Sequence, residues 1–290
     1  MRPNIIINTT SKHLGHVFSK DDFNVFYTTK NKDDKYYFPD GEMYIRLDKV
    51  DDIKGRTIII HSGAPDPNKG LIELEIILSI LKKNKVKPIE VFFTYFPYGM
   101  QDKSFLSGEL NIAEDLLKKL VNYYKVSKIY IIEPHFSHRD WIKSYPIKII
   151  STLELFSKMI KDKYSKLFFL SADCGQIKRS GIDGVKKKRM NSHNVKFVFD
   201  EKIKTAVKKR NICIIDDLIE TGNTLNKLFI ECKKNGAKQV VVFVSHAVLL
   251  EGVKKVSLNV DEFYTTNTIR RRRFNVDIGS LIIDNINSVK

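Results

Sequence analysis

Short apolar runs alternate with helical segments along most of this chain, and that alternation constrains its fold more than any other feature. In the first half, the expected strands are 57–61, 89–94 and 129–132, and the expected helices are 71–81 and 112–121. Strands and helices that alternate in this way are typical of a mainly parallel sheet covered by helices. The sequence therefore predicts an α/β fold.

The same alternation occurs again in the second half of the chain. Further strands are expected at 167–170, 212–215 and 240–244. Between the last two lies a helical pattern that ends at Gly236, a residue that commonly follows the last turn of a helix. The second half is therefore also expected to form a parallel sheet with helices.

Two domains are expected from the length and from this repeat of the pattern. A chain of 290 residues with 42% hydrophobic residues is long enough for two buried cores. We place the junction near residues 145–150 and allow a C-terminal segment to cross back. The expected domains are therefore 1–147 and 148–290.

The composition argues against a membrane-spanning or disulfide-stabilised protein. No apolar run reaches the length of a transmembrane helix, and the N-terminus lacks the apolar stretch of a signal peptide. The three cysteines, Cys174, Cys213 and Cys232, lack metal-ligand spacing and are expected to be reduced and buried. We expect a cytoplasmic protein that does not associate with membranes.

The formal net charge of +16 is compatible with nucleic-acid binding. The lysines are nevertheless scattered along the chain, and a small anionic substrate needs only a few of them. The arginine run Arg270–Arg273 is either a nucleic-acid or polyanion contact or a solvated or subunit-contact segment. We therefore do not expect nucleic acid as the main partner.

Residues 212–224 form the most informative motif of the chain. An apolar strand ends at Asp216 and Asp217, and a loop of small residues leads into a helix. Backbone N–H groups in such a loop bind phosphate, and the hydroxyls of Thr221 and Thr224 add donors. Carboxylates accept hydrogen bonds from sugar hydroxyls or hold a hydrated divalent cation. The motif predicts a site for a phosphorylated sugar; the alternative is an ordinary acidic turn.

Two further segments carry an aromatic residue beside polar side chains. Residues 37–42 form an expected turn that presents an aromatic ring and two carboxylates, which can meet a nucleotide base and its donors. Residues 95–103 follow a strand directly, where functional residues often lie. Taken alone, the first segment is better explained as a surface hairpin turn, and the second is equally well explained as a solvated loop.

Three charged or titratable positions complete the set of candidates. His135 follows the strand 129–132 and Asp173 follows the strand 167–170, so both can meet a metal–phosphate complex. The basic run 186–189 can neutralise the charge that develops in phosphoryl transfer. The alternatives are a structural histidine and a solvated charged face.

In their order and spacing, these motifs resemble those of the ribose-phosphate pyrophosphokinase family, the phosphoribosyl pyrophosphate synthetases, over residues 36–270. Phe38-Pro39-Asp40-Gly41-Glu42 resembles the FPDGE turn of the family, and Tyr95–Tyr98 with Gln101-Asp102-Lys103 resembles its PYFPYARQDK segment. Asp216–Thr224 is similar to its sugar-phosphate motif, and Thr266-Asn267-Thr268 to a late TNT segment. The turn Ser107-Gly108-Glu109 is closer to the shorter archaeal-type members.

Three departures from the family pattern lie within these motifs. Met100 stands where the family has an arginine, which removes a cation near the triphosphate. Glu220 replaces an aspartate, and Asn223 replaces a glycine. Asparagine tolerates a left-handed backbone, but its side chain is expected to enter the phosphate pocket. These changes affect which acceptor is expected and how tightly ATP is expected to bind.

The resemblance implies two tandem phosphoribosyltransferase-like domains, each a mainly parallel sheet flanked by helices. Domain 1–147 would carry the ATP side and domain 148–290 the sugar-phosphate site. The implied reaction transfers a diphosphoryl group from ATP to the anomeric hydroxyl of ribose 5-phosphate, giving phosphoribosyl pyrophosphate and AMP. The resemblance also implies Mg²⁺ and a homo-oligomer of at least two chains.

The resemblance also assigns roles to individual residues. The sugar-phosphate site would comprise Asp216, Asp217, Glu220, Thr221, Gly222, Asn223 and Thr224. ATP would be bound by Phe38, Asp40, Glu42, Gln101 and Asp102, and the metal by His135 and Asp173. Lys187 and Arg189 would be catalytic together with His135, and Lys188 would replace Lys187 under a one-residue shift.

Three other functions stay open at this stage. The same chemistry could act on a modified acceptor such as ADP-ribose. A non-catalytic regulatory homologue would explain Met100 but not the basic run. A base phosphoribosyltransferase, or a nucleic-acid-binding regulator with that fold, would share the sugar motif but lack the FPDGE-like turn.

Overall fold

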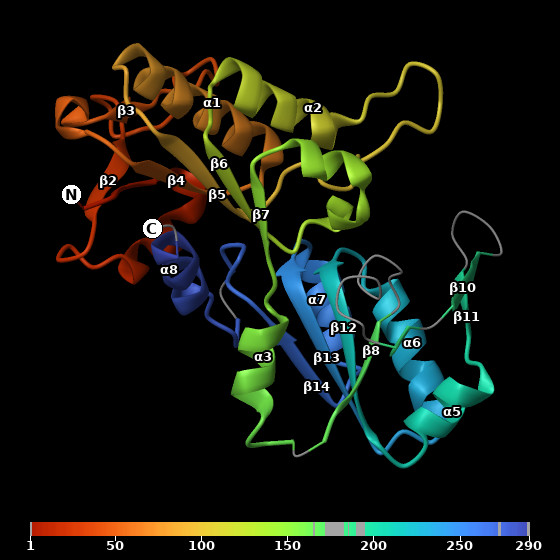
Figure 1. Cartoon of the computed structure of the whole chain (residues 1–290). Coiled ribbons are helices and arrows are strands. Elements are labelled where there is room, and N and C mark those ends of the chain that lie inside the picture. Colours follow the sequence, from red (N-terminus) through yellow and green to blue (C-terminus); the bar gives the residue numbers. More distant parts are fainter. Residues whose placement is uncertain are drawn as a thin grey trace. The chain divides into compact units, whose positions relative to one another are not determined.

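The computed structural model describes residues 2–164, 166–171, 183–184, 186–189, 195–271 and 274–288, with only the backbone described between 183 and 198. The chain forms two compact units (Figure 1). The first unit comprises Met1–Ser151, Thr268–Arg270 and Gly279–Lys290, and the second comprises Thr152–Asn267 and Arg271–Ile278.

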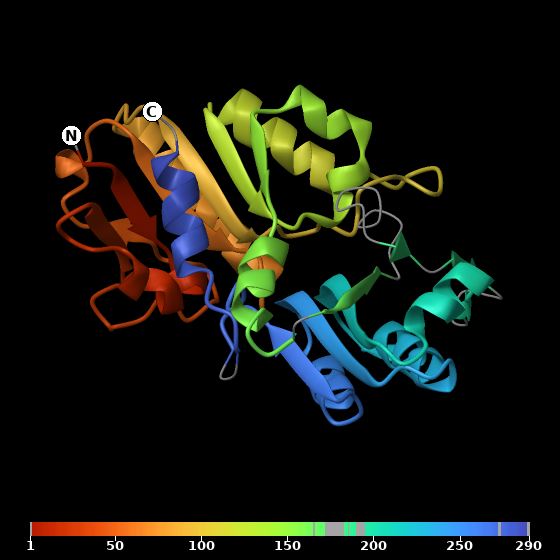
Figure 2. The same ribbon diagram turned by 60° about the horizontal axis from the view of Figure 1, so that its bottom comes forward.

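The two units differ from the expected ranges 1–147 and 148–290 because the last helix packs with the first unit. This helix, α8 (Gly279–Asn287), lies against η1 (Thr9–Val17), and Figure 2 shows it alongside the strands of the first unit. Arg56 Nη1 donates to the carbonyl oxygen of Ile286 at 3.0 Å. The chain therefore returns to the first unit at its C-terminus.

The first unit is built on a seven-stranded sheet in the order β3-β2-β1-β4-β5-β6-β7. All neighbouring strands are parallel except β2 and β3. The strands are β1 (Asn4–Ile7), β2 (Asn24–Thr29), β3 (Arg46–Leu47), β4 (Thr57–Ser62), β5 (Ile89–Tyr95), β6 (Lys128–Ile132) and β7 (Ile147–Ile150). Strand β4 is buried along its whole length because helices cover both faces of the sheet.

Helices α1 (Pro67–Lys83) and α2 (Ile112–Lys118) cover one face of this sheet, and α8 covers the other (Figures 1 and 2). Asp66 caps α1 by accepting from Lys69 N, and Pro67 occupies its first turn. α2 continues into the π-turn η3 (Lys119–Tyr123). The short helices η2 (Val50–Asp52), η4 (His135–His138) and η5 (Asp140–Ser144) lie in the connections.

The second unit is built on a five-stranded parallel sheet in the order β14-β13-β12-β8-β9. Its strands are β8 (Phe168–Ser171), β9 (Asp183–Gly184), β12 (Asn211–Ile219), β13 (Gln239–Ala247) and β14 (Glu262–Thr265). Its helices are α3 (Leu153–Ile160), α5 (Glu201–Val207), α6 (Asn223–Lys234) and α7 (Leu250–Ser257). Strands β10 (Lys186–Arg189) and β11 (Val195–Val198) form a separate antiparallel hairpin.

Alternate residues of β12 feed two apolar cores on the two faces of this sheet. Ile212 and Ile214 pack with residues of α5, α6 and α7, whereas Cys213 and Ile215 pack with residues of α3. Cys213 and Cys232 are free and buried, and burial raises the pKa of the Cys232 thiol to about 12. These two thiols are therefore packing residues, while Cys174 lies outside the described residues.

The predicted α/β class with mainly parallel sheets is confirmed, and most expected strands match to within a residue or two. The main error concerns β12, which was expected to end at Ile215 but continues through both aspartates to Ile219. No helix within the described part of the chain is both long and apolar enough to span a bilayer.

A neutral histidine is buried in the first unit, where β4 approaches the loop after β1. The amide oxygen of Asn8 accepts from Ser11 N at 3.2 Å and from Ser11 Oγ at 2.8 Å, which orients the amide. The Asn8 Nδ2 group therefore donates to His61 Nδ1 at 2.7 Å. Because Nδ1 accepts, the ring carries its proton on Nε2, which is buried without a hydrogen-bond partner among the described residues. Burial lowers the pKa of His61 to about 3.

We predict that His61→Gln flattens the pH dependence of unfolding between pH 6.5 and pH 4. In the wild-type chain, the unfolded state binds a proton below a pKa of about 6.5 while the folded ring stays neutral, so acid destabilises the fold. This term costs about 2 kcal/mol at pH 5. Denaturant unfolding at several pH values measures the slope.

His138→Gln is the matched control, because His138 is exposed. Burial also raises the pKa of Glu73. Glu73 is present in both variants, so its contribution to the pH dependence cancels in the comparison. An unchanged slope in His61→Gln would show that His61 is protonated in the folded state.

Candidate functional site

The two aspartates of the sugar-phosphate motif lie within β12 and are not equivalent. Asp217 is only 3% exposed, and its Oδ1 accepts from Leu218 N at 2.8 Å. Asp216 is half-buried, and its Oδ1 accepts from Asp217 N at 3.1 Å. Neighbouring residues of a strand point to opposite faces of a sheet. The structure therefore distinguishes two carboxylates that the sequence treated as a pair.

The loop after β12 leads into α6, which begins at Asn223. Gly222 is the N-cap, with a left-handed φ of 71°, and no side chain caps the helix. The first N–H groups of a helix have no intrahelical partner. Thr221 and Asn223 are exposed and Thr224 is half-buried. The loop therefore has the geometry of an anion-binding helix N-terminus.

Helix α7 packs closely against this loop, and the contact requires a glycine on each side: Gly252 on α7 and Gly222 in the loop. A Cβ on Gly252 would lie 1.8 Å from the carbonyl oxygen of Glu220, so no side chain fits there. A Cβ on Gly222 would lie 2.7 Å from Val256 Cγ2. The segment before α7 is also bound, since Val248 N donates to the carbonyl oxygen of Ile219 at 3.1 Å. The shape of the loop thus depends on its packing against α7.

The side chain of Asn223 is bound by a lysine that the sequence analysis missed. Lys255 Nζ, on α7, donates to Asn223 Oδ1 at 2.5 Å. The structure thus shows the Asn223 amide in contact with α7, where it was expected to occupy the phosphate pocket. The contact also brings a cation to the edge of the loop. Spacing along α7 would not have identified it, because Lys255 lies far from the loop in sequence.

Arg271, from the arginine run 270–273, and Asn267, from the TNT segment, both make structural contacts. Arg271 Nε donates to the carbonyl oxygen of Ala247 at 2.9 Å, and its Nη2 donates to that of Val248. Burial lowers the pKa of this guanidinium. Asn267 Oδ1 accepts from Ile278 N at 2.8 Å. Arg271 therefore supports the connection between β13 and α7, while Arg272 and Arg273 lie outside the described residues.

In the first unit, the FPDGE-like segment forms a tight hairpin turn. Phe38 N donates to the carbonyl oxygen of Glu42 at 2.8 Å, and Asp40 Oδ1 accepts from Glu42 N at 3.0 Å. Gly41 supplies the φ of 93° that the turn requires. The rings of Phe38 and Tyr44 meet edge to face, and Phe38 stays 43% exposed. The turn therefore presents one aromatic ring and two exposed carboxylates on the surface of this unit.

Asp102 was expected to bind ATP, but in the structure it forms a buried ion pair. Arg139 Nε and Nη2 donate to its two carboxylate oxygens at 2.8 and 3.1 Å. This bidentate contact raises the pKa of Arg139. Gln101 and Met100 are both exposed beside it. Arg139 was missed by the sequence analysis, although it follows the same strand as His135.

His135 begins η4 directly after β6, and its ring lies 6.4 Å from that of His138. Glu133, just before it, has a left-handed φ of 38° although it is not a glycine. Such backbone strain is common at functional sites. Among the described residues, no three histidine, cysteine or acidic side chains come together as a metal site. Asp173, the other expected metal ligand, lies outside them.

Lys187 and Arg189 lie on the strand β10. Their backbones pair with those of Phe197 and Val195 on β11. Their side chains lie outside the described atoms, so their catalytic role stays a prediction. The structure thus adds a short hairpin to the expected basic segment.

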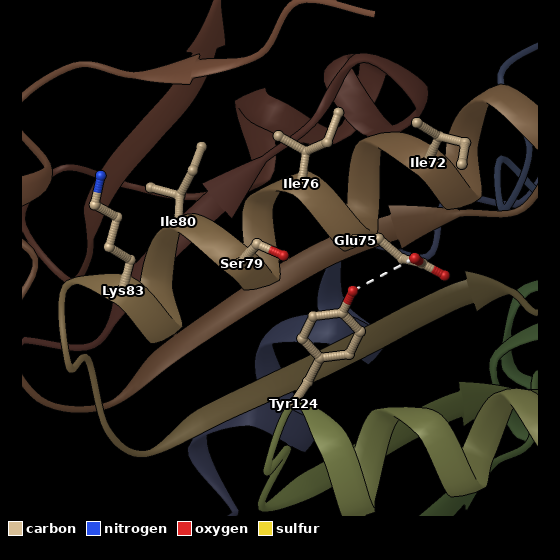
Figure 3. Close-up of a pocket in the computed structure, with 7 residues that line it drawn as sticks. All are labelled: Ile72, Glu75, Ile76, Ser79, Ile80, Lys83 and Tyr124. Carbon is tan, nitrogen blue, oxygen red and sulfur yellow. Dashed lines mark hydrogen bonds between the residues drawn. The ribbon is translucent and has the colours of Figure 1, made fainter.

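A surface pocket of about 380 Å³ runs along α1 in the first unit (Figure 3). Ile72, Ile76 and Ile80 form its apolar side. Its carboxylate, Glu75, already accepts from Tyr124 Oη at 3.4 Å and from Lys119 Nζ at 2.8 Å. Phosphorylated sugars require anion donors, so this pocket matches such a ligand less well than the loop before α6.

Comparisons with known proteins identify several similar sequences. A model of the N-terminal domain of ribose phosphate pyrophosphokinase matches residues 24–123. The ribose-phosphate pyrophosphokinase of Pyrococcus furiosus is 29% identical over 245 residues, which cover 80% of this chain and 84% of that protein. Its counterpart from Pyrococcus abyssi is 26% identical over 296 residues, with 98% of each chain covered.

The fold is also that of a solved structure. The phosphoribosylpyrophosphate synthetase of Mycobacterium smegmatis superposes with a TM-score of 0.79 over 99% of both chains, at 21% sequence identity. Together with the sequence similarity along both units, this places the predicted motifs in the expected fold. The chain therefore resembles the ribose-phosphate pyrophosphokinases in sequence and has the fold of a phosphoribosylpyrophosphate synthetase.

Proposed function

We propose that this chain transfers a diphosphoryl group from ATP to the anomeric hydroxyl of ribose 5-phosphate, producing phosphoribosyl pyrophosphate and AMP. The observation that carries the proposal is the uncapped start of α6, which follows two carboxylates and is fixed by α7. The named relatives of this chain are ribose-phosphate pyrophosphokinases. The enzyme would thus be a diphosphotransferase of nucleotide biosynthesis.

The loop before α6 would hold the 5-phosphate through its backbone N–H groups and through Thr221 and Thr224. Asp216, which is half-buried at the same edge, would accept hydrogen bonds from the ribose hydroxyls. Asp217 would assist from its buried position. The anomeric oxygen then attacks the β-phosphorus of ATP, a new P–O bond forms, and the bond to the AMP oxygen breaks.

Charge compensation is the other requirement of this reaction. Lys187 and Arg189 would neutralise the transferred group and the departing AMP. Phe38, Asp40 and Glu42 would meet the nucleotide base from the hairpin turn, and Gln101 would contact the nucleotide directly. Because Asp102 is paired with Arg139, we assign it the role of fixing that loop.

Mg²⁺ would complete the charge balance on the ATP phosphates. Mg²⁺ prefers oxygen ligands and usually keeps several waters, so a single carboxylate beside bound phosphates suffices to hold it. Asp173 and the half-buried Asp216 supply carboxylates of this type, and His135 would lie near the phosphates. When bound, the ion would stabilise negative charge on the transferred phosphoryl groups.

The contact between Lys255 and Asn223 favours ribose 5-phosphate over an esterified acceptor. A free 5-phosphate carries up to two negative charges, whereas a phosphodiester such as that in ADP-ribose carries one per phosphate. The cation beside the loop therefore stabilises the free phosphate more strongly.

We predict that AMP is released at least ~10-fold faster with ribose 5-phosphate than with ADP-ribose at equal concentrations, because of this extra charge. The assay mixes each acceptor with ATP and Mg²⁺ and counts AMP. Lys255→Ala should reduce the ratio between the two acceptors. Faster turnover with ADP-ribose would reassign the acceptor, and the lack of AMP with both would favour a non-catalytic protein.

Lys187→Ala and Arg189→Ala are each expected to lower kcat on the order of 10³-fold, because each removes a cation that acts on the transferred group. Binding of ribose 5-phosphate, measured by calorimetry, should stay within a few-fold of the wild type. Lys188→Ala serves as the matched control on the same strand and tests the one-residue shift. Full activity in both variants would remove this strand from the mechanism.

Gly252→Ala should abolish most ribose 5-phosphate binding, because its Cβ would occupy the position of the Glu220 carbonyl and displace the loop. We expect the affinity to fall by at least ~10-fold, a loss of about 1.4 kcal/mol. Glu251→Ala, an exposed change on the same helix, is the control. Unchanged affinity in a folded Gly252→Ala protein would mean that the sugar phosphate binds elsewhere.

A further inference from the structure

The second unit contains a basic pocket at the amino-terminal ends of its strands. Its volume is about 530 Å³. The residues before β8, β12 and β13 form it: Lys166, Leu167, Phe168, Lys209, Arg210, Asn211 and Lys238. Strand register brings these segments together, since Ile212 pairs with Phe168 and Asn211 pairs with Gln239. The pocket therefore lies at the edge of the sheet opposite to the α6 loop.

Backbone hydrogen bonds fix the turns that carry these cations. Lys209 has a left-handed φ of 60°, and its N–H group donates to the carbonyl oxygen of Gly236 at 2.8 Å. Lys238 N donates to the carbonyl oxygen of Arg210 at 2.9 Å. The turns before β12 and β13 are thus hydrogen-bonded to each other. The backbone positions that carry the cationic side chains of the pocket are therefore fixed.

The positive charge of the pocket is not matched by local acids. None of its four cationic side chains forms an ion pair with the residues that the structure describes. The nearest acids along the same edge have other partners: Asp261 pairs with Lys233 at 2.5 Å, and Glu262 pairs with Lys163 at 2.7 Å. Like charges around one pocket raise its affinity for an anion.

Asn211 adds a polar group to the pocket wall. Its Oδ1 is buried and has no hydrogen-bond partner among the described residues. A buried carbonyl oxygen without a partner is costly, and a water that accompanies a bound anion can donate to it. The pocket therefore offers four cations and one acceptor.

We propose that this pocket binds an anion that carries two or more linked phosphate groups. Four positive charges match a di- or triphosphate better than a single phosphate, whose charge is about −2 near neutral pH. Arg210 can bind two phosphate oxygens at once, while the lysines act as point charges. Both inorganic polyphosphate and a nucleotide supply this chemistry.

This site is separate from the sugar-phosphate loop. Asn211 and Asp217 stand six positions apart on the same strand, about 20 Å at the usual rise per residue. A ligand in the pocket therefore cannot reach the α6 loop. The proposal does not rest on the reaction assigned to that loop.

Lysine footprinting of the full-length protein tests the proposal locally. Tripolyphosphate is the first probe, and an amine-reactive reagent followed by mass spectrometry measures the labelling rate at each lysine. We expect Lys166, Lys209 and Lys238 to be protected several-fold, whereas exposed Lys20 and Lys254 keep their rates. Protection should weaken at high salt. Equal rates with and without the probe, or equal protection at all lysines, would overturn the proposal.

A double variant provides the second readout. Arg210→Ala/Lys238→Ala should remove the protection at Lys166 and weaken tripolyphosphate binding at this site by at least ~10-fold. Lys20→Ala/Lys254→Ala removes the same charge elsewhere and should leave the protection at Lys166 and the binding of tripolyphosphate unchanged. Repeating the footprint with pyrophosphate and with ATP identifies the source of the phosphates. Identical behaviour of the two double variants would show that only the overall charge of the chain attracts the anion.

Discussion

The close packing of α7 against the loop after β12 is the contact on which the candidate site depends. The carbonyl oxygen of Glu220 occupies the space that any side chain on residue 252 would need. That approach fixes Gly222 as the N-cap of α6 and leaves the first N–H groups of the helix without a side-chain cap. Arg271 and the backbone of Val248 hold the segment that leads into α7. The shape of the proposed anion site thus depends on contacts from three separate segments.

Buried polar groups play a similar supporting role in the first unit. The Asn8 amide orients the buried ring of His61, and Arg139 holds Asp102 in a bidentate pair. Each of these contacts fixes a loop at the carboxyl edge of the sheet, where parallel α/β folds place their ligands.

The sequence predicted the architecture well because hydrophobic periodicity is a local signal. The strands β4, β5 and β6 and the helix α1 were all expected from it. The extension of β12 through Asp216 and Asp217 was missed, since two adjacent carboxylates normally end a strand in such a pattern. Pairing with β13 overrides that preference, because residues 216, 218 and 219 all have partners there.

The candidate site was only partly predictable from the sequence. Its motif residues are local, so the loop and its anion-binding backbone could be inferred from 212–224 alone. Lys255, Gly252 and Arg139 reach their partners only through the tertiary fold, and no spacing rule links them to those partners. For the same reason, the sequence treated Asp102 as a ligand residue when the structure pairs it with a cation.

A structure of the protein with ribose 5-phosphate tests the central claim most directly. The account predicts that the phosphate lies within hydrogen-bonding distance of the backbone N–H groups of residues 221–224, with a ribose hydroxyl on Asp216. Clear density for the sugar phosphate at another place, with these N–H groups unoccupied, would contradict it.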